Sequence, residues 1–239
     1  MKNCVLASII VAGAGLAQWG NAATVDLSTT TGGAINGGLF QRFDQQSTGT
    51  GVINSFLRLQ ANGTEQGYNT SGRPVPFDEL NDPSTHNLTL GQLPILNVSG
   101  TDYYSFLLDT NEPNGGGQDL VTLDELQFYT SATGSQTTTT VGSLGTLRYD
   151  LGTGNSVIVD DNFSHGSGQG DARILIPTSA FGAALATDFV YLVAHFSNAS
   201  GGFEEFAIQA SASAIPLPSV AGLGAAGLVG FAGVRRRRV

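Results

Sequence analysis

The stretch Phe189-Val-Tyr-Leu-Val-Ala-His-Phe196 is apolar at nearly every position and rich in β-branched and aromatic residues. Such residues favour strands, and a strand without polar alternation is typical of one that is covered on both faces. The sequence therefore predicts a central strand of a sheet at 189–196. A short helix is expected just before it, at Ser179 to Ala186.

Other strand signals recur along the chain, each bounded by Gly, Asn, Asp or Pro. They are Thr24 to Ser28, Val52 to Gln60, Tyr103 to Asp109, Val121 to Tyr129, Ser143 to Asp150, Ser156 to Asp160, Ala172 to Ile176 and Phe203 to Gln209. This spacing predicts an all-β fold, an antiparallel β-sandwich or jelly roll. No Pro-rich or charged linker divides residues 23–214, so they are expected to form one domain.

One of these strands has an irregular pattern. From Val121 to Phe128, apolar side chains fall on odd positions up to Leu123 and on even positions from Leu126. An extra residue at Asp124-Glu125 is the simplest cause, so a β-bulge is expected there.

The charge of the chain is distributed unevenly. Charged residues make up 12% of the 239 residues, and Lys2 and four of the nine arginines lie at the two ends. The body between the ends holds five arginines against 19 carboxylates, a net charge of −14. Nucleic acid and anionic lipid repel such a body, so neither is expected as its partner.

The N-terminus has the layout of a secretory signal peptide. A basic start at Lys2 precedes the apolar run Val5 to Ala17, and small residues stand at Gly20 and Ala22. Cleavage after Ala22, by a signal peptidase, defines residues 1–22 as the expected leader. The mature chain then lacks cysteine, which excludes disulfides and thiolate chemistry.

The C-terminus, residues 215–239, has three zones. Ile215 is followed by a proline box, an uncharged stretch covers residues 219–234, and a cationic cluster ends the chain. The box is Pro216, Leu217 and Pro218, and the cluster is Arg235, Arg236, Arg237 and Arg238. As a helix, the uncharged stretch spans roughly 24 Å of a hydrocarbon core about 30 Å thick. The arginines keep to the cytoplasmic side, so the body is expected on the far side.

The order of these zones resembles the PEP-CTERM class of bacterial sorting signals, in its Val-Pro-Leu-Pro variant. The chain departs from the commoner pattern at Leu217, where that class usually has Glu. The resemblance implies a precursor held in the inner membrane by its C-terminal helix. It also implies cleavage by an exosortase-like enzyme and delivery to the cell envelope or outside the cell.

Motifs for catalysis are not evident. His86, His165 and His195 stand apart without the spacing of paired metal ligands, and His195 is expected to be a strand residue with a satisfied ring. Ser167 lies outside a Gly-x-Ser-x-Gly elbow. Adjacent acids such as Glu204-Glu205 should point to opposite faces of a strand, so they cannot pair as glycosidase carboxyls.

The nearest approach to a site is a set of oxygen-bearing side chains around one loop. Asp109 and Asn111 precede this loop, and Asp124 and Glu125 follow it at the suspected bulge. Calcium takes six to eight such oxygens, so these four residues are candidate ligands for a structural calcium ion. A merely solvated acidic loop is the alternative, and no other cofactor is expected.

Three functional hypotheses remain open. The first is a non-enzymatic protein of the cell envelope or of an exopolysaccharide matrix. The second is a secreted carbohydrate-binding module, with aromatic side chains such as Tyr103, Tyr129 or Tyr149 stacking on sugar rings. The third is a polysaccharide-active enzyme whose site is dispersed in the sequence.

Overall fold

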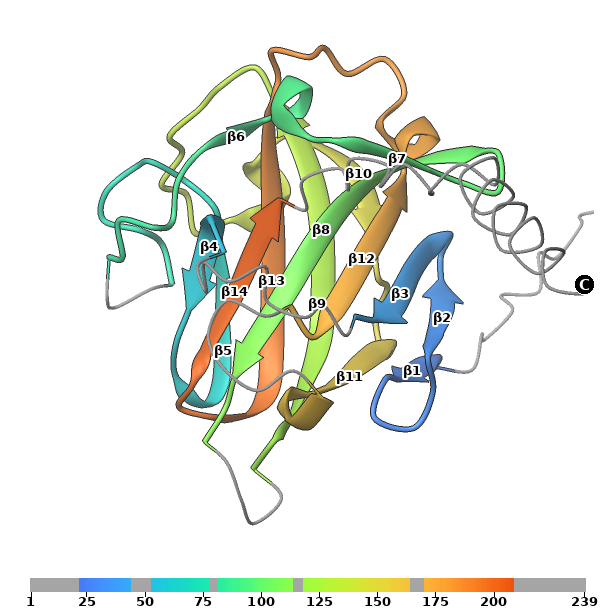
Figure 1. Ribbon diagram of the computed structural model, residues 1–239. Helices are drawn as coiled ribbons and strands as arrows, with labels where there is room; N and C mark the ends of the chain where they lie inside the picture. Colours follow the sequence, from blue (N-terminus) through green and yellow to red (C-terminus); the bar gives the residue numbers. More distant parts are fainter. Residues whose placement is uncertain (1–21, 44–52, 78–80, 114–117, 164–169, 209–239) are drawn as a thin grey trace, which may run out of the picture.

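The computed structural model describes residues 22–43, 53–77, 81–113, 118–163 and 170–208. These residues form two mostly antiparallel sheets, and one sheet lies in front of the other in Figure 1. The expected leader and the sorting signal lie outside the described residues, apart from Ala22. Within the described part, no helix is long and apolar enough to cross a membrane.

The sheet that contains the long strand β13 is called the β13 sheet. Its strands are β1 (Thr24–Asp26), β5 (Asn62–Tyr68), β6 (Leu88–Thr89), β9 (Leu120–Ser131), β10 (Thr146–Asp150), β11 (Ser156–Asp160) and β13 (Phe189–Ser200). β13 lies between β9 and β5, and β10 and β11 pair with successive parts of the other edge of β9. β1 pairs with β11 in parallel.

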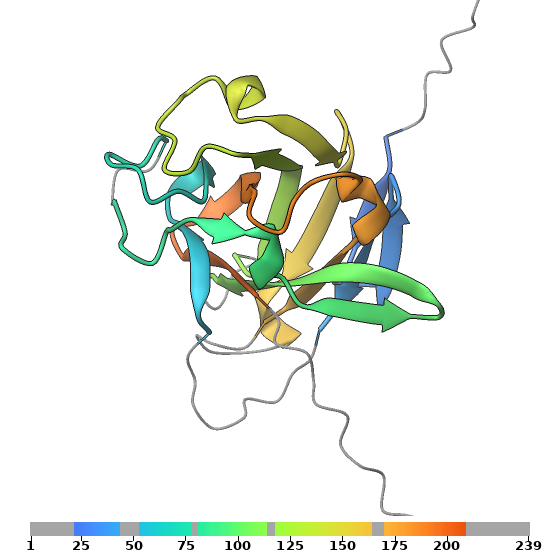
Figure 2. The same ribbon diagram turned by 90° about the horizontal axis from the view of Figure 1, so that it is seen from above.

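The second sheet, called the β8 sheet, packs against the first. Its strands are β2 (Gly32–Ile35), β3 (Gly38–Arg42), β4 (Ser55–Leu59), β7 (Ile95–Val98), β8 (Thr101–Asn111), β12 (Ala172–Pro177) and β14 (Phe203–Ile208). The hairpin of β7 and β8 reaches out beyond the body, as the view from above shows (Figure 2). Four short 3-10 turns complete the described elements: η1 (Leu90–Gln92), η2 (Val141–Ser143), η3 (Asp161–Phe163) and η4 (Thr178–Phe181).

The apolar core lies between the two sheets. Phe106 from β8 and Phe128 from β9 are fully buried, and their ring centroids are 4.8 Å apart. Phe196 from β13 meets Phe206 from β14 at 6.0 Å in the same way. Rings from opposite sheets therefore interlock, which makes the arrangement sandwich-like and confirms the all-β prediction.

A second, smaller cluster covers the opposite face of the β13 sheet. It consists of Tyr68, Tyr129, Leu144, Tyr191 and Val193. The connection from β9 to β10 closes over it, and this connection accepts hydrogen bonds from two of the tyrosines. β13 is thus covered on both faces over most of its length, as its apolar sequence predicts.

The predicted strands are all present, with small shifts at their ends, and the bulge is confirmed. His195 pairs with Glu125 and Phe196 with Leu123, so Asp124 is the extra residue. The helix expected at Ser179 to Ala186 is wrong. Only the four-residue turn η4 forms, because Gly182 takes a φ of 52° and ends the helical geometry.

Candidate functional site

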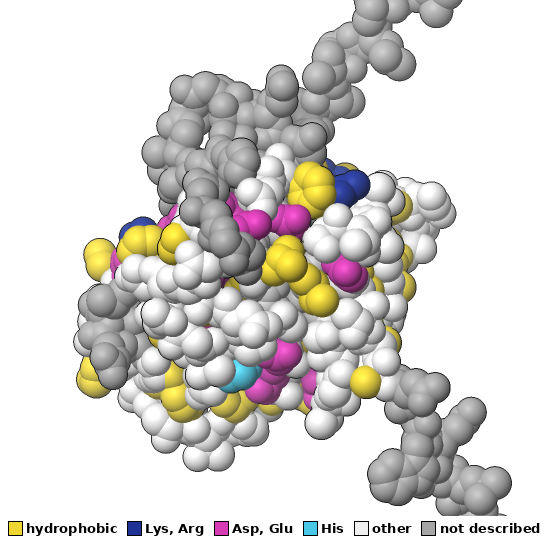
Figure 3. Space-filling model, turned by 90° about the horizontal axis from the view of Figure 1, so that it is seen from below, with side chains coloured by type: hydrophobic (Ala, Val, Ile, Leu, Met, Phe, Trp, Pro, Cys, Tyr) yellow, Lys and Arg dark blue, Asp and Glu magenta, His cyan; other side chains and the backbone are white. Residues whose placement is uncertain are grey.

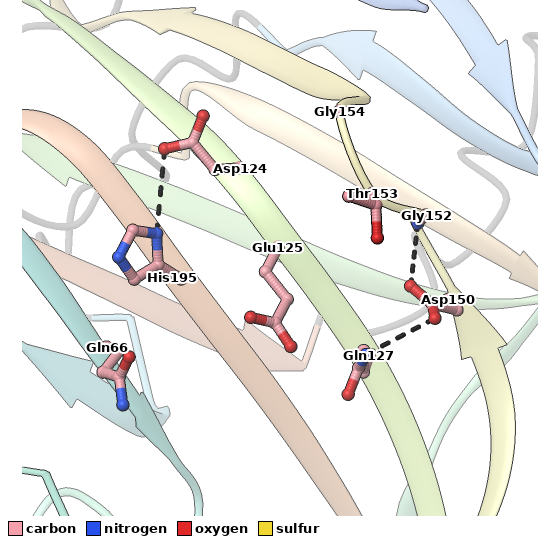
Figure 4. Close-up of a pocket in the computed structure, with 9 residues that line it drawn as sticks. All are labelled: Gln66, Asp124, Glu125, Gln127, Asp150, Gly152, Thr153, Gly154 and His195. Atoms are coloured by element: carbon pink, nitrogen blue, oxygen red, sulfur yellow. Dashed lines mark hydrogen bonds and ion pairs between the residues drawn. The ribbon is translucent and has the colours of Figure 1, made fainter. Parts of the chain in front are cut away.

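A polar groove lies on the outer face of the β13 sheet, away from the core. Its volume is about 440 Å³, and four neighbouring segments contribute to it. Its lining residues are Gln66, Asp124, Glu125, Gln127, Asp150, Gly152, Thr153, Gly154 and His195 (Figure 4). We call this the outer groove.

Strand register arranges the outer groove in rows. Gln66 of β5, His195 of β13 and Glu125 of β9 are direct cross-strand partners and form one row. Gln127 of β9 and Asp150 of β10 are partners in the next row. Side chains in a row share one face of the sheet, so polar groups from four strands converge on one surface.

The bulge adds a carboxylate to this surface. In a regular strand Asp124 and Glu125 would point to opposite faces, whereas here both line the outer groove. Oδ2 of Asp124 lies 3.7 Å from Nδ1 of His195, a contact that becomes an ion pair when the imidazole is protonated. His195 is a strand residue, as expected, and this contact with Asp124 is the one that its ring makes in the outer groove.

Hydrogen bonds fix the other end of the outer groove. Asp150 accepts a hydrogen bond from the backbone N–H of Gly152 at 2.7 Å and one from the side-chain amide Nε2 of Gln127 at 3.4 Å. The hydroxyl group of Tyr129 donates to Oε1 of Gln127 at 2.7 Å. Burial raises the pKa of Tyr129, and the charges of Asp150 and Glu125 raise it further, so this hydroxyl stays a neutral donor.

The outer groove has no Lys or Arg among its lining residues to offset its three carboxylates, and His195, beside Asp124, is its one group that can become cationic. The five arginines of the body are engaged elsewhere. Arg58 contacts Asp82 and Glu205, Arg73 donates to backbone carbonyls, and Arg148 donates to Thr130. Arg42 and Arg173 lie over phenylalanine rings. Acidic side chains also gather at several points on the face seen from below, one group beside a histidine (Figure 3).

A separate group of carboxyls is buried between the sheets. Glu204 of β14 is fully buried and contacts the carboxyl groups of Glu65 and Glu112. Glu112 is held by the backbone N–H groups of Ser200 and Gly202, and Glu65 by that of Ala61. Burial and the two neighbouring carboxyls raise the pKa of Glu204 strongly, which keeps it protonated.

The structure does not bring the four expected calcium ligands together. Asp109 is buried on β8, and Asn111 at the end of that strand donates to the carbonyl of Phe203. Asp124 and Glu125 lie in the outer groove on the other sheet, because the chain changes sheets between β8 and β9. Among the residues that the structure describes, no group of three or more His, Cys, Asp or Glu side chains is arranged to hold a metal ion.

Of the three tyrosines expected to stack on sugar rings, two are too deeply buried to do so. Tyr129 and Tyr149 are each only 5% exposed, because Tyr129 packs under the β9–β10 connection and Tyr149 lies in the core. Tyr149 donates its hydroxyl to the carbonyl of Ile35 at 2.8 Å. Tyr103 is half-buried on β8, on the sheet opposite the outer groove.

Sequence reasoning missed Gln66, Gln127 and the turn from Asp150 to Gly154. β5 reads Asn-Gly-Thr-Glu-Gln-Gly-Tyr, which lacks the apolar alternation of a strand, so Gln66 gave no signal. The change of phase in the apolar alternation at Asp124-Glu125 is the one feature of the sequence that points to the groove. Comparison with family models, with curated proteins and with solved structures found no match.

Proposed function

We propose that the chain is an exported, non-enzymatic protein of the cell envelope or extracellular matrix, processed at a C-terminal sorting signal. The observation that carries this proposal is the order of proline box, uncharged stretch and arginine cluster at residues 215–239. The leader at the opposite end supports the same destination.

Fractionation of cells, with mass spectrometry of both termini, tests this function. The mature protein is expected to begin at Ala23 and to end near Pro218. Deleting Arg235 to Arg238 removes the cationic stop, so the precursor should mislocalise, whereas replacing the four arginines by lysines should preserve sorting. Wild-type protein found in the membrane and intact through Val239 would overturn the proposal.

A second function, carbohydrate binding, is favoured by the outer groove. Carboxylates and amides that converge on one open sheet face offer the paired donors and acceptors that sugar hydroxyls require. No Phe, Tyr or Trp is among the lining residues of the groove, so hydrogen bonding rather than stacking would carry the binding. A glycan array probed with the full-length protein tests this function, and an array without a hit would contradict it.

A further inference from the structure

The outer groove combines an unbalanced negative charge with unused hydrogen-bonding groups. Asp124, Glu125 and Asp150 line it, and none of the body's arginines reaches it. Within the described part of the chain, no hydrogen bond or ion pair engages the side chain of Gln66 or that of Glu125. An anionic ligand would be repelled here, and a cationic ligand attracted.

The dimensions and lining of the groove restrict the class of ligand further. Its rows cross β5, β13, β9 and β10, three strand spacings or about 14 Å in all. None of the nine lining residues has a large apolar side chain. A basic peptide would leave its apolar atoms without contacts, whereas a chain of hydroxylated rings could hydrogen-bond along the whole row.

We propose that the outer groove binds a linear glycan whose sugar rings carry free, protonated amino groups. This proposal rests on the carbohydrate-binding function above and names its ligand class. The ammonium group makes a charge-assisted hydrogen bond to Glu125, and Asp124, which contacts His195, adds a second negative charge nearby. The side-chain amide of Gln66, two strands away in the same row, hydrogen-bonds ring hydroxyls of the neighbouring sugar. The bulge brings Asp124 onto the same face as Glu125 and so adds a second carboxylate at the β9 end of the row.

Binding of three oligosaccharide series to the full-length protein tests the proposal by calorimetry. The series are glucosamine oligomers, fully N-acetylated glucosamine oligomers of equal length, and uronic acid oligomers. Glucosamine oligomers should bind about tenfold more tightly than the acetylated ones, as expected for one lost charge-assisted hydrogen bond. Their affinity should fall as salt is raised, and the uronic acid series should not bind.

Three variants assign the effect to residues. Glu125→Gln should reduce the preference for the free amine, and Gln66→Ala should weaken both glucosamine series equally. Asp102→Asn is the matched control, because it removes one exposed charge from the β7–β8 hairpin, outside the groove. It should leave both affinities unchanged.

Each contrary outcome has a different meaning. Equal binding of acetylated and free oligomers would overturn the amine proposal and leave carbohydrate binding intact. No binding of any series would overturn both. Equal binding of a lysine homopolymer, or shortening of the oligomers during the measurement, would replace the proposal by nonspecific charge attraction or by hydrolysis.

Discussion

The carboxyl groups of Glu204 and Glu65 face each other between the two sheets, where at most 6% of either residue is exposed. Two buried carboxylates this close cannot both carry a charge at low cost, so a proton is retained between them. The nearby Glu112 adds a third carboxyl to the group. None of the described arginines contacts this group of carboxyls, so the bound proton, rather than a cationic side chain, reduces its negative charge.

This proton makes the stability of the fold depend on pH. The pKa of Glu204 is raised in the folded state, whereas in the unfolded chain it lies at about 4.3. Between these two values the folded state binds more protons, so the free energy of unfolding falls by about 1.4 kcal/mol per pH unit for this group. Urea unfolding at pH 5 and at pH 8 should show lower stability at pH 8.

Glu204→Gln should flatten this dependence and raise stability at pH 8 by at least about 1 kcal/mol, because the amide cannot ionise in the unfolded state. Glu205→Gln is the matched control on the next residue. Glu205 lies 3.3 Å from Arg58, so its substitution should cost about 1 kcal/mol instead. An unchanged pH dependence in Glu204→Gln would show that Glu204 is ionised in the folded protein.

Asp171 should titrate far above an ordinary aspartate. Burial raises its pKa to about 9, against the hydrogen bonds from Thr110, and Asp109 and Asp161 add to the rise. Carbon-13 NMR of the side-chain carboxyl should therefore show a midpoint near that value. In Asp171→Asn, stability should fall less steeply from pH 5 to pH 9 than in the wild type. A midpoint below 5 would contradict the expectation.

Gly202 should not tolerate a side chain. A Cβ atom at this position would lie 2.0 Å from the carbonyl oxygen of Asn111, and the N–H of Gly202 holds Glu112. Gly202→Ala is expected to destabilise the fold by about 3 kcal/mol, since backbone must move. Gly142→Ala is the control, because nothing lies within 4 Å of its Cβ position. Equal melting temperatures of the two variants would contradict this account.

Sequence patterns predict the apolar strands of this fold well and the polar ones poorly. β13 is recognisable because both of its faces are covered over most of its length, and β9 because burial on the core face imposes apolar residues at alternate positions. β5 was not, because its inward positions are occupied by Glu65 and Gly67, the latter packed against Leu59. The outer groove depends on β5 and on cross-strand register, and register between distant segments leaves little trace in either strand alone.

Leu144 should matter as much as a core residue although it lies in a connection. It is fully buried, in the cluster with Tyr129 and Tyr191 on the outer face of the β13 sheet. Leu144→Ala is expected to cost about 2 to 4 kcal/mol of unfolding free energy. Leu147→Ala, three residues on and 46% exposed, should cost less than about 1 kcal/mol. Similar losses in the two variants would show that the connection does not close the cluster.

Substitution of Tyr149 distinguishes a structural role of this residue from a role in stacking on sugar rings. Its ring packs against Phe128 at a centroid distance of 6.2 Å, and its hydroxyl bonds to the buried carbonyl of Ile35. Tyr149→Phe keeps the ring and removes the hydroxyl, so the carbonyl loses its partner at a cost of about 1 to 3 kcal/mol. Affinity for any glycan bound in the outer groove should stay unchanged, because Tyr149 does not line it. Chemical denaturation and calorimetry on the same preparation measure both effects. A loss of glycan affinity with unchanged stability would return Tyr149 to the binding surface and contradict its burial in the core.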